Sequence, residues 1–357
     1  MLKNTKRLLV ICCSLLLLGG ILAGCTNVEE QKAEQIREKE SAAQTFYDNK
    51  QYAEAVALYD QIVAIDDQHA DAYVKRALSY IAMGNIEKAQ LDLKRAEPLM
   101  QTPTGAYYQA SGLTYRANKQ FDQALESFDK ALAIGESSTL FAQRAWVNYD
   151  LHQIDAAQND LISALALDAG NANIFWLKAQ LAADSGDYQD AIDNANRALK
   201  LDKSLADAQA IKGYAMYKLA SVDAGSSTNN IDTEYKKELD AALKTEKTAT
   251  VYNYIGMVAL EVGDYQTAYD NFTKAIELDN RNAKVQNSSA MALHKLGKNE
   301  EALVDANTAI TLDPEVAEYY YNRAQILDAL NLKSAATRDY NKAVELDKKY
   351  ADMIPKE

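Results

Sequence analysis

Small residues recur along this chain at intervals near 34 residues, and this spacing limits the fold more than any other feature of the sequence. Nine consecutive segments carry alanine or glycine at their eighth residue. Counted from their own first residues, the segments are 36–69, 70–103, 105–138, 138–171, 172–205, 206–248, 249–282, 283–316 and 317–350. The small residues are Ala43, Ala77, Gly112, Ala145, Ala179, Gly213, Gly256, Ala290 and Ala324. The chain is therefore expected to stack one small structural unit many times.

Each segment is predicted to form two amphipathic helices whose axes approach closely at the small residues. Larger residues at two further positions are predicted to fill the space between the helices. At the fourth position stand Tyr73, Tyr108, Phe141, Phe175, Tyr252 and Tyr320, and at the twenty-fourth stand Tyr59, Leu93, Phe128, Leu161, Leu239, Phe272 and Tyr340. Gly84, Gly186, Gly263 and Gly297 come between the predicted helices, where a left-handed residue ends a helix.

This pattern resembles the tetratricopeptide repeat, a helical hairpin of 34 residues with aromatic and small residues at fixed positions. The resemblance covers residues 36–350. It implies an all-α fold, a right-handed superhelical solenoid of about nine helix-turn-helix repeats. The departures from the pattern are that only Pro103 and Pro314 occupy the closing position, and that Lys39, Gln209 and Gln286 replace the early aromatic residue.

Two segments depart from the regular repeat. The sixth repeat carries an insertion over residues 221–230, rich in Ser, Gly and Asn, which we place in the loop between its paired helices. Long loops cost little closure entropy, so a neutral insertion is one interpretation, and a hinge or a loop that touches a partner is the other. After the last repeat, the tail 351–357 contains Pro355, which favours an exposed C-terminal edge.

Residues 1–24 have the three parts of a secretory signal peptide, with basic residues, an apolar stretch and then small residues. The run Leu22-Ala23-Gly24-Cys25 resembles the lipobox of bacterial lipoproteins. That resemblance implies that the Cys25 thiol receives a diacylglycerol and that Cys25 becomes the mature N-terminus. Residues 25–35 would then form the lipidated start and a short stalk, or would lengthen the first helix.

This N-terminus predicts a location in the bacterial cell envelope. A lipid anchor would hold the protein at the extracytoplasmic face of the cell membrane or at the outer membrane, and two or three acyl chains give stable anchoring. An uncleaved membrane helix over the apolar stretch is the alternative, since its length is near that needed to span a bilayer. Both interpretations place the repeats outside.

The charge balance limits the class of partner. The chain has 51 acidic and 38 basic residues, a net charge of −13. Loss of the three basic residues within 1–24 would leave 35 against 51, a net charge of −16. Such a chain repels phosphate backbones, so we predict no nucleic-acid partner. An apolar or basic protein or peptide is the expected partner.

Cysteine and histidine do not suggest a bound metal or cofactor. Cys12 and Cys13 would leave with the signal peptide, so the repeats would have no thiol for a disulfide. His69, His152 and His294 are far apart in sequence and do not form a ligand cluster. We therefore predict no metal and no cofactor.

In tetratricopeptide proteins the first helices of the stacked repeats line a concave groove, and the resemblance places six aromatic residues on or beside it. They are Trp146, Tyr149, Trp176, Tyr214, Tyr217 and Tyr254. Rigid aromatic rings bury a large area at low entropy cost, so these residues predict a protein-binding groove. Packing between adjacent repeats is the alternative.

Polar residues extend this predicted groove. Asn253, Asn287 and Asn322 are candidates to hydrogen-bond the backbone of an extended ligand. The charged groove candidates are Asp150, Asp184, Asp207 and Glu261 on the acidic side and Lys218, Lys284 and Lys295 on the basic side. The acidic residues dominate the centre, which agrees with a basic partner.

The sequence predicts that this protein is not an enzyme. It lacks the usual hydrolase, metalloprotease, phosphate-loop and calcium-loop motifs. Some tetratricopeptide co-chaperones hold a carboxylate with clamp lysines, but Glu40, Val74 and Gln109 stand where the first of these would be, which disfavours a receptor for chaperone tails.

The resulting expectation is a membrane-anchored, extracytoplasmic scaffold that mediates protein–protein interaction in an envelope complex. Two alternatives stay open. One is an accessory factor for pilus, secretion or outer-membrane assembly, and the other is a carrier of a non-protein ligand such as glycan.

Overall fold

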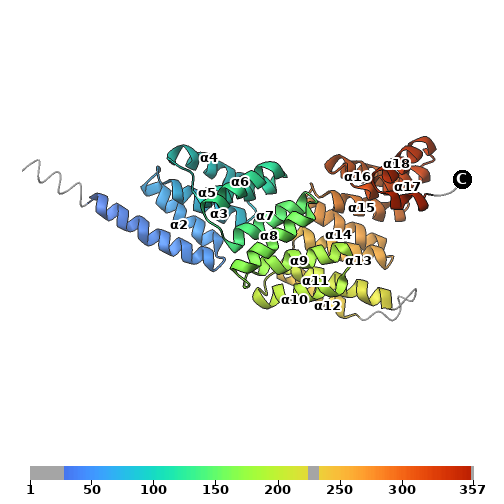
Figure 1. Cartoon of the computed structure of the whole chain (residues 1–357), viewed down its shortest axis with the longest axis horizontal. Helices are drawn as coiled ribbons and strands as arrows, with labels where there is room; N and C mark the ends of the chain where they lie inside the picture. The colour runs from blue at the N-terminus through green and yellow to red at the C-terminus, as the bar shows by residue number, and fades with distance from the viewer. Residues whose placement is uncertain (1–27, 224–232, 355–357) are drawn as a thin grey trace, which may run out of the picture. The chain divides into compact units, whose positions relative to one another are not determined.

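The computed structural model describes residues 28–223 and 233–354, in which every regular element is a helix (Figure 1). The predicted signal peptide, Cys25 and most of the 221–230 insertion lie outside the described residues. The chain forms two compact units, unit 1 over Met1–Ala169 and unit 2 over Gly170–Glu357. The predicted all-α class is confirmed for the described part of the chain.

Unit 1 contains helical hairpins in the order expected from the first four repeats. Its elements are a helix over residues 28–48, α2 (Tyr52–Ile65), α3 (Ala70–Ala82), α4 (Ile86–Ala96), the short 3-10 helix η1 (Glu97–Leu99), α5 (Gly105–Ala117), α6 (Phe121–Ile134), α7 (Ser138–Asp150) and α8 (Ile154–Leu167). Residues 28–35 continue the first helix and are all exposed, whereas Ile36 is buried. The described part of the predicted stalk therefore lengthens the first helix.

Unit 2 contains the hairpins of the last five repeats. Its elements are α9 (Ala172–Ser185), α10 (Tyr188–Leu201), α11 (Ala206–Asp223), α12 (Glu234–Thr245), α13 (Ala249–Glu261), α14 (Tyr265–Leu278), α15 (Ala283–Lys295), α16 (Asn299–Leu312), α17 (Ala317–Ala329), α18 (Lys333–Leu346) and the 3-10 helix η3 (Lys348–Asp352). In both units, the odd-numbered α helices from α3 to α17 are the first helices of their repeats.

Side-chain caps fix where many first helices begin. The Ser137 and Thr248 hydroxyls accept hydrogen bonds from backbone N–H groups in the first turns of α7 and α13. Such a bond satisfies one of the four N–H groups that a helix start leaves without a partner. His69, Thr104, Asn171 and Asn282 cap α3, α5, α9 and α15 in the same way.

The turns inside the hairpins use left-handed backbone, as predicted. Gly186 follows the last residue of α9 with φ of 82°, a conformation that costs glycine little. Gly84, Gly263 and Gly297 also have positive φ. Four repeats place a residue with a side chain there instead, namely Lys50, Lys119, His152 and Asn331.

Close helix packing explains the small residue at the eighth position. A Cβ added to Gly256 would lie 2.7 Å from the Phe272 ring, and one added to Gly112 would lie 2.9 Å from the Phe128 ring. Where alanine occupies this position it is fully buried, as Ala43 and Ala290 are. The predicted close approach of the two helices is confirmed.

The predicted core is confirmed at the twenty-fourth position of the repeat and corrected at the fourth. All seven residues named at the twenty-fourth position are buried. At the fourth position Tyr73 and Phe175 are buried, whereas Tyr108, Phe141, Tyr252 and Tyr320 are only half-buried. At all six rings, buried and half-buried alike, a lysine or arginine cation lies 5.3–5.7 Å from the ring centroid.

Three repeats share an arginine–aspartate pair that sequence reasoning did not find. In α3, Arg76 donates to both carboxylate oxygens of Asp92 on α4, at 2.7 Å each. The Arg76 Nη1 also donates to Asp60 on α2, in the preceding repeat. Arg144 with Asp160 and Arg323 with Asp339 repeat this geometry sixteen residues apart. The pair joins both helices of a repeat and ties them to the repeat before.

The C-terminal edge is more covered than the sequence suggested. Tyr350 in η3 is buried, and its ring packs 5.1 Å from that of Tyr321 on α17. The Tyr321 hydroxyl donates to the Met353 carbonyl oxygen. Within the described residues, η3 therefore covers the end of the last repeat.

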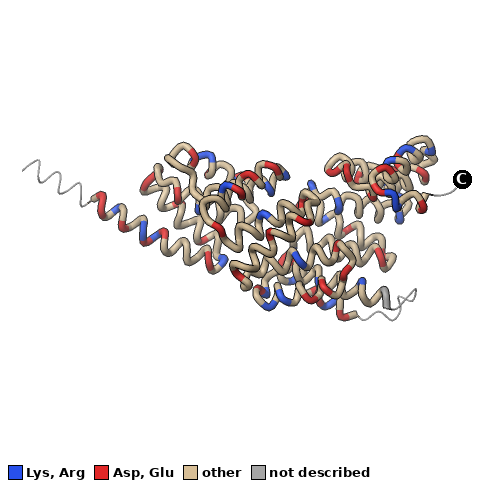
Figure 2. Tube along the Cα trace, viewed as in Figure 1, with Lys and Arg blue, Asp and Glu red and all other residues tan. Residues whose placement is uncertain are grey.

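Acidic and basic residues are interspersed along both units (Figure 2). No helix in the part of the chain that the structure describes is both long and apolar enough to cross a membrane.

Candidate functional site

The first helices of neighbouring repeats pack side by side and form the surface on which binding was predicted. In unit 2, α11 packs against α9 and α13, and α15 contacts α13 and α17. In unit 1, α5 contacts α3 and α7. We call the surface made by α9, α11, α13, α15 and α17 the first-helix surface of unit 2.

In unit 1 the two predicted aromatic residues form one cluster. Trp146 and Tyr149 are half-buried on α7, with their ring centroids 5.7 Å apart in an edge-to-face arrangement. The Arg116 guanidinium of α5 lies 5.2 Å from the Trp146 ring centroid and pairs with Asp150 at 2.6 Å. A cation from the preceding repeat thus already occupies this aromatic face.

In unit 2 three of the four predicted aromatic residues are buried. Tyr214, Tyr217 and Tyr254 are 7%, 2% and 3% exposed. The Tyr214 and Tyr254 rings lie 5.0 Å apart, joining α11 to α13, and Tyr217 packs on Tyr235 of α12. Tyr214 and Tyr254 thus pack between adjacent repeats, which was the alternative interpretation, whereas Tyr217 packs within its own repeat. Trp176 on α9 is half-buried against the same cluster and keeps part of its surface.

Burial also governs the chemistry of these tyrosines. Burial raises the pKa of Tyr254 well above its usual value, and the nearby Asp184 carboxylate adds to the effect. The pKa of Tyr214 is raised by burial and then by Glu261. Both hydroxyls therefore stay neutral and act as hydrogen-bond groups.

The structure brings two of the three predicted asparagines together. Asn322 Nδ2 on α17 donates to Asn287 Oδ1 on α15 at 3.1 Å, and both residues are buried. Asn253 on α13 is half-buried, and its Nδ2 lies 3.6 Å from the Met257 Sδ. The Asn253 Oδ1 is buried and has no hydrogen-bond donor among the described residues.

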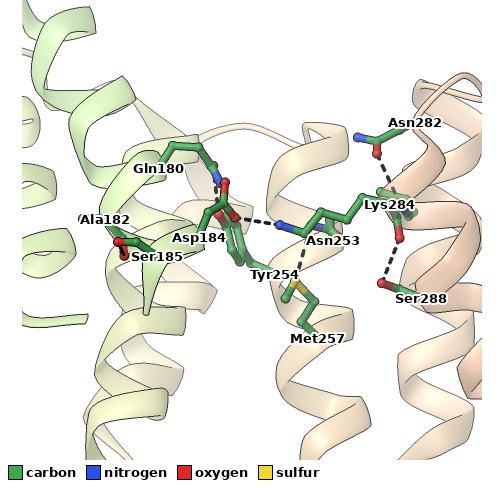
Figure 3. A network of polar contacts seen from close by, with 11 residues as sticks. Gln180, Ala182, Asp184, Ser185, Asn253, Tyr254, Met257, Asn282, Lys284 and Ser288 are labelled. Atoms are coloured by element: carbon green, nitrogen blue, oxygen red, sulfur yellow. Dashed lines mark hydrogen bonds and ion pairs between the residues drawn. The ribbon is translucent and has the colours of Figure 1, made fainter. Parts of the chain in front are cut away.

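The charged residues of the predicted groove are largely paired with one another (Figure 3). The Lys284 Nζ of α15 lies 2.7 Å from the Asp184 Oδ1 of α9, across a separation of 100 residues. Gln180 Nε2 donates to Asp184 Oδ2, and the Tyr254 hydroxyl donates to Gln180 Oε1 at 2.8 Å. These contacts connect the fifth, seventh and eighth repeats.

Two further acids of the predicted groove have internal partners. Lys218 Nζ on α11 lies 3.0 Å from both carboxylate oxygens of Glu261 on α13. Asp207 on α11 accepts a hydrogen bond from the Thr248 hydroxyl at the start of α13. Burial raises the pKa of Asp207 to about 6, although the hydrogen bond from Thr248 lowers it.

Sequence reasoning missed that these charges pair across repeats. It placed Asp184 and Lys284 on the groove with opposite signs, but the spacing of 100 residues gave no sign that they meet. Gln180, which links Asp184 to Tyr254, was not predicted at all. The available signal was the opposite charge at groove positions three repeats apart.

The described residues do not form a metal site. Within 28–223 and 233–354, no three His, Cys, Asp or Glu side chains are grouped so that they could hold a metal ion. The surface instead carries aromatic rings, amide groups and ion pairs. These are the groups that recognise peptides and proteins.

Models of the tetratricopeptide repeat family match residues 46–110, 142–213, 105–134, 249–282, 283–316 and 317–350. The last three ranges have the same bounds as the last three predicted repeats. Together the matches cover well over half of the chain. The chain therefore belongs to the tetratricopeptide repeat family, and the predicted solenoid fold is confirmed.

Curated relatives share the repeats over part of their length. The DnaJ homolog subfamily C member 7 homolog of Schizosaccharomyces pombe is 26% identical over 277 residues, which cover 72% of this chain and 51% of the relative. The human DnaJ homolog subfamily C member 7 is 26% identical over 212 residues, covering 52% and 43%. The chain thus spans about half the length of the curated relatives it matches.

A solved structure shows the same fold. A monomeric mutant of IFIT1 with Gppp-AAAA superposes with a TM-score of 0.52 at 14% sequence identity, covering 77% of this chain and 69% of that chain. At this identity the likeness concerns the fold alone.

Proposed function

We propose that this protein is a lipid-anchored, extracytoplasmic scaffold that binds a protein partner through the first helices of its repeats. The observation that carries the proposal is the stack of tetratricopeptide repeats, whose first helices present half-buried aromatic rings beside charged groups. Each repeat is stabilised by contacts with its neighbouring repeats. We therefore attribute the exposed part of these rings to binding a partner rather than to stability.

The excess of acidic residues supports a basic or apolar partner. The net charge of −13 disfavours nucleic acid, and three predicted groove acids lie on α9, α11 and α13 of unit 2. Electrostatic attraction of this kind accelerates encounter with a cationic partner.

The proposed anchor rests on the sequence of the N-terminus. The basic, apolar and small residues of 1–24, followed by Cys25, support export and lipid attachment. An anchor at one end would raise the local concentration of the repeats near a partner in the same membrane.

The test is capture of partners by the tagged full-length protein from native membranes after brief cross-linking. Two variants probe the surface, Trp146→Ala with Tyr149→Ala in unit 1, and Trp176→Ala in unit 2. Tyr265→Ala is the matched control, because this tyrosine is also half-buried but belongs to a second helix, α14. Circular dichroism first verifies that all variants keep the helical content of the wild type.

Loss of the same partner in a surface variant, with retention in the Tyr265→Ala control, would support the scaffold. Unchanged capture in every variant would reject the first helices as the binding site. If the wild type captures no protein above background, the scaffold is rejected in favour of a carrier of a non-protein ligand. A deletion strain that loses one surface structure would identify the scaffold as an assembly factor for pili, secretion or the outer membrane.

A further inference from the structure

Two polar contacts in unit 2 cross more than one repeat. In a tetratricopeptide solenoid each repeat contacts its neighbours, yet Lys284 of the eighth repeat reaches Asp184 of the fifth. Tyr254 of the seventh repeat likewise donates to Gln180 of the fifth. Both contacts end on α9, one coming from α13 and the other from α15, so they link separate helices of the first-helix surface of unit 2 (Figure 3).

The groups around these contacts carry an excess of negative charge. Besides burial, the Asp184 carboxylate raises the pKa of both Tyr214 and Tyr254, Glu261 raises that of Tyr214, and Asp207 raises that of Tyr254. Two of these acids pair with lysines of the chain: Glu261 pairs with Lys218, and Asp184 pairs with Lys284. The site is thus a cluster of acids that attracts cations, and lysines of the chain itself now fill part of it.

The Lys284–Asp184 pair is accessible enough to be exchanged. The Lys284 side chain is 48% exposed and that of Asp184 is 29% exposed. Ion pairs at this degree of exposure add little to stability, because water and salt screen them. A cation from another molecule can therefore compete with Lys284 for the carboxylate.

A second acceptor lies on α13. Asn253 precedes Tyr254 in the sequence (Figure 3), and its buried Oδ1 has no donor among the described residues. A buried carbonyl oxygen without a donor is uncommon in folded proteins. An ammonium or guanidinium group offers several N–H donors and can satisfy a carboxylate and an amide oxygen together.

We propose that Lys284 is an internal stand-in for a basic side chain of the partner, which displaces it from Asp184 and binds there between α9 and α13. This inference rests on the proposed function and adds the chemical class of the partner residue, a lysine or an arginine. It also assigns the specificity of the first-helix surface of unit 2 to one carboxylate.

The consequence is that Lys284 competes with the partner for Asp184 and so weakens the affinity of the protein for that partner. A partner binds only molecules in which Lys284 has left Asp184, so its apparent dissociation constant equals the intrinsic constant divided by the fraction of open molecules. Lys284→Met removes the ammonium and keeps most of the side-chain stem, so the acid becomes available. Asp184 keeps its hydrogen bond from Gln180 in this variant.

The experiment uses the full-length protein in detergent and a blocked trilysine peptide, Ac-Lys-Lys-Lys-NH2, with Ac-Glu-Glu-Glu-NH2 as the control probe. Calorimetry measures the dissociation constant for the wild type, for Lys284→Met and for Lys284→Met with Asp184→Asn. Lys130→Met is the matched control, because Lys130 forms an exposed pair with Glu126 on α6 at the same distance of 2.7 Å.

The expected result is trilysine binding about tenfold tighter in Lys284→Met than in the wild type, within the usual range of coupling between two sites. The gain should vanish when Asp184→Asn is added, and Lys130→Met should bind as the wild type does. Equal affinity of Lys284→Met and wild type, or a gain that survives Asp184→Asn, would overturn the proposal.

These results are separate from partner capture, so the scaffold can fail while the Asp184 site stands, and the reverse.

Discussion

Gly256 shows how a single missing side chain sets the distance between two helices. The Phe272 ring of α14 occupies the space into which a Cβ on α13 would project. The repeat needs this contact because Phe272 is fully buried at the centre of its own cluster. The same arrangement holds for Gly112 with Phe128 and Gly213 with Leu239.

We predict that Gly256→Ala destabilises unit 2. A methyl group 2.7 Å from the ring forces repacking, which typically costs about 1–3 kcal/mol, more than the gain of about 1 kcal/mol from the higher helix propensity of alanine. Urea denaturation should show the loss. Gly105→Ala is the control, since its Cβ would lie at an ordinary 3.7 Å from Ile134. Recovery of stability on adding Phe272→Leu would verify the cause, and an unchanged midpoint for Gly256→Ala would refute it.

We predict that Asp207 makes unit 2 less stable as the pH rises from 4 to 7. Burial raises its pKa from 3.8 to about 6, so ionising it costs more in the folded protein than in the unfolded chain. By pH 7, above the folded pKa, this penalty is almost fully present; it shrinks as the pH falls below 6 and disappears only well below 3.8, where the group is protonated in both states. Asp207→Asn should therefore be more stable than the wild type at pH 7, by about 1–3 kcal/mol, with most of this advantage lost at pH 4.

The measurement is the difference in the free energy of unfolding between Asp207→Asn and wild type across this pH range. Taking the difference cancels the titration of all other carboxyls. Asp240→Asn, on the exposed side of α12, is the control. A constant difference between pH 4 and pH 7 would contradict the prediction.

At the scale of elements, the arginine–aspartate pair is a contact between helices that the sequence did not predict. The 34-residue spacing of small residues predicted the hairpins, because steric fit acts at every repeat. The spacing of sixteen between Arg76 and Asp92 occurs in only three repeats, and Lys212 with Glu238 and Ser289 with Asp305 take the equivalent places in two others. Because different residue types form the equivalent contact in different repeats, the sequence shows no repeated motif at these positions.

We predict that Arg76→Ala loosens α3, α4 and α2 together. Arg76 and Asp92 are both buried, so removing the cation leaves a buried carboxylate without its partner, at a cost of about 3–5 kcal/mol. Hydrogen exchange should show lost protection in all three helices. Lys130→Ala, which breaks an exposed pair on α6, should change little. A loss confined to α3 would show that the pair does not couple the helices.

The candidate site was predictable in its residue types and not in its contacts. Groove positions were assigned by resemblance, which located Asp184, Lys284 and Tyr254 on first helices. Whether a side chain on those helices faces a ligand or a neighbouring repeat depends on how tightly the repeats coil. That quantity comes from small differences in packing summed over several repeats, and a single repeat does not reveal it.

At the scale of the whole molecule, the division into two units falls between the fourth and fifth repeats. The repeat spacing stays near 34 residues across Ala169 and Gly170, so the spacing carried no sign of this division. The nine repeats were expected as one array, and the structure groups them as four and five.

We predict that Cys25 holds the protein in the membrane. Cells fed an alkyne-bearing fatty acid should incorporate it into the wild type, and Cys25→Ser should abolish both the label and recovery in the membrane fraction. The reason is that the acyl chains, each worth about 0.8 kcal/mol per buried CH₂, supply the anchoring energy. Labelling of Cys25→Ser, or membrane recovery without any label in the wild type, would rule out this anchor.

The contact between Lys284 and Asp184 also has a consequence for the order of folding. Hairpins form from residues close in sequence and are therefore fast, whereas a contact 100 residues apart waits until the repeats between its ends are in place. During synthesis the fifth repeat emerges well before the eighth. For that interval Asp184 has no Lys284 to meet, so if the proposed role of Asp184 holds, the newly made chain is more receptive to a partner than the finished one.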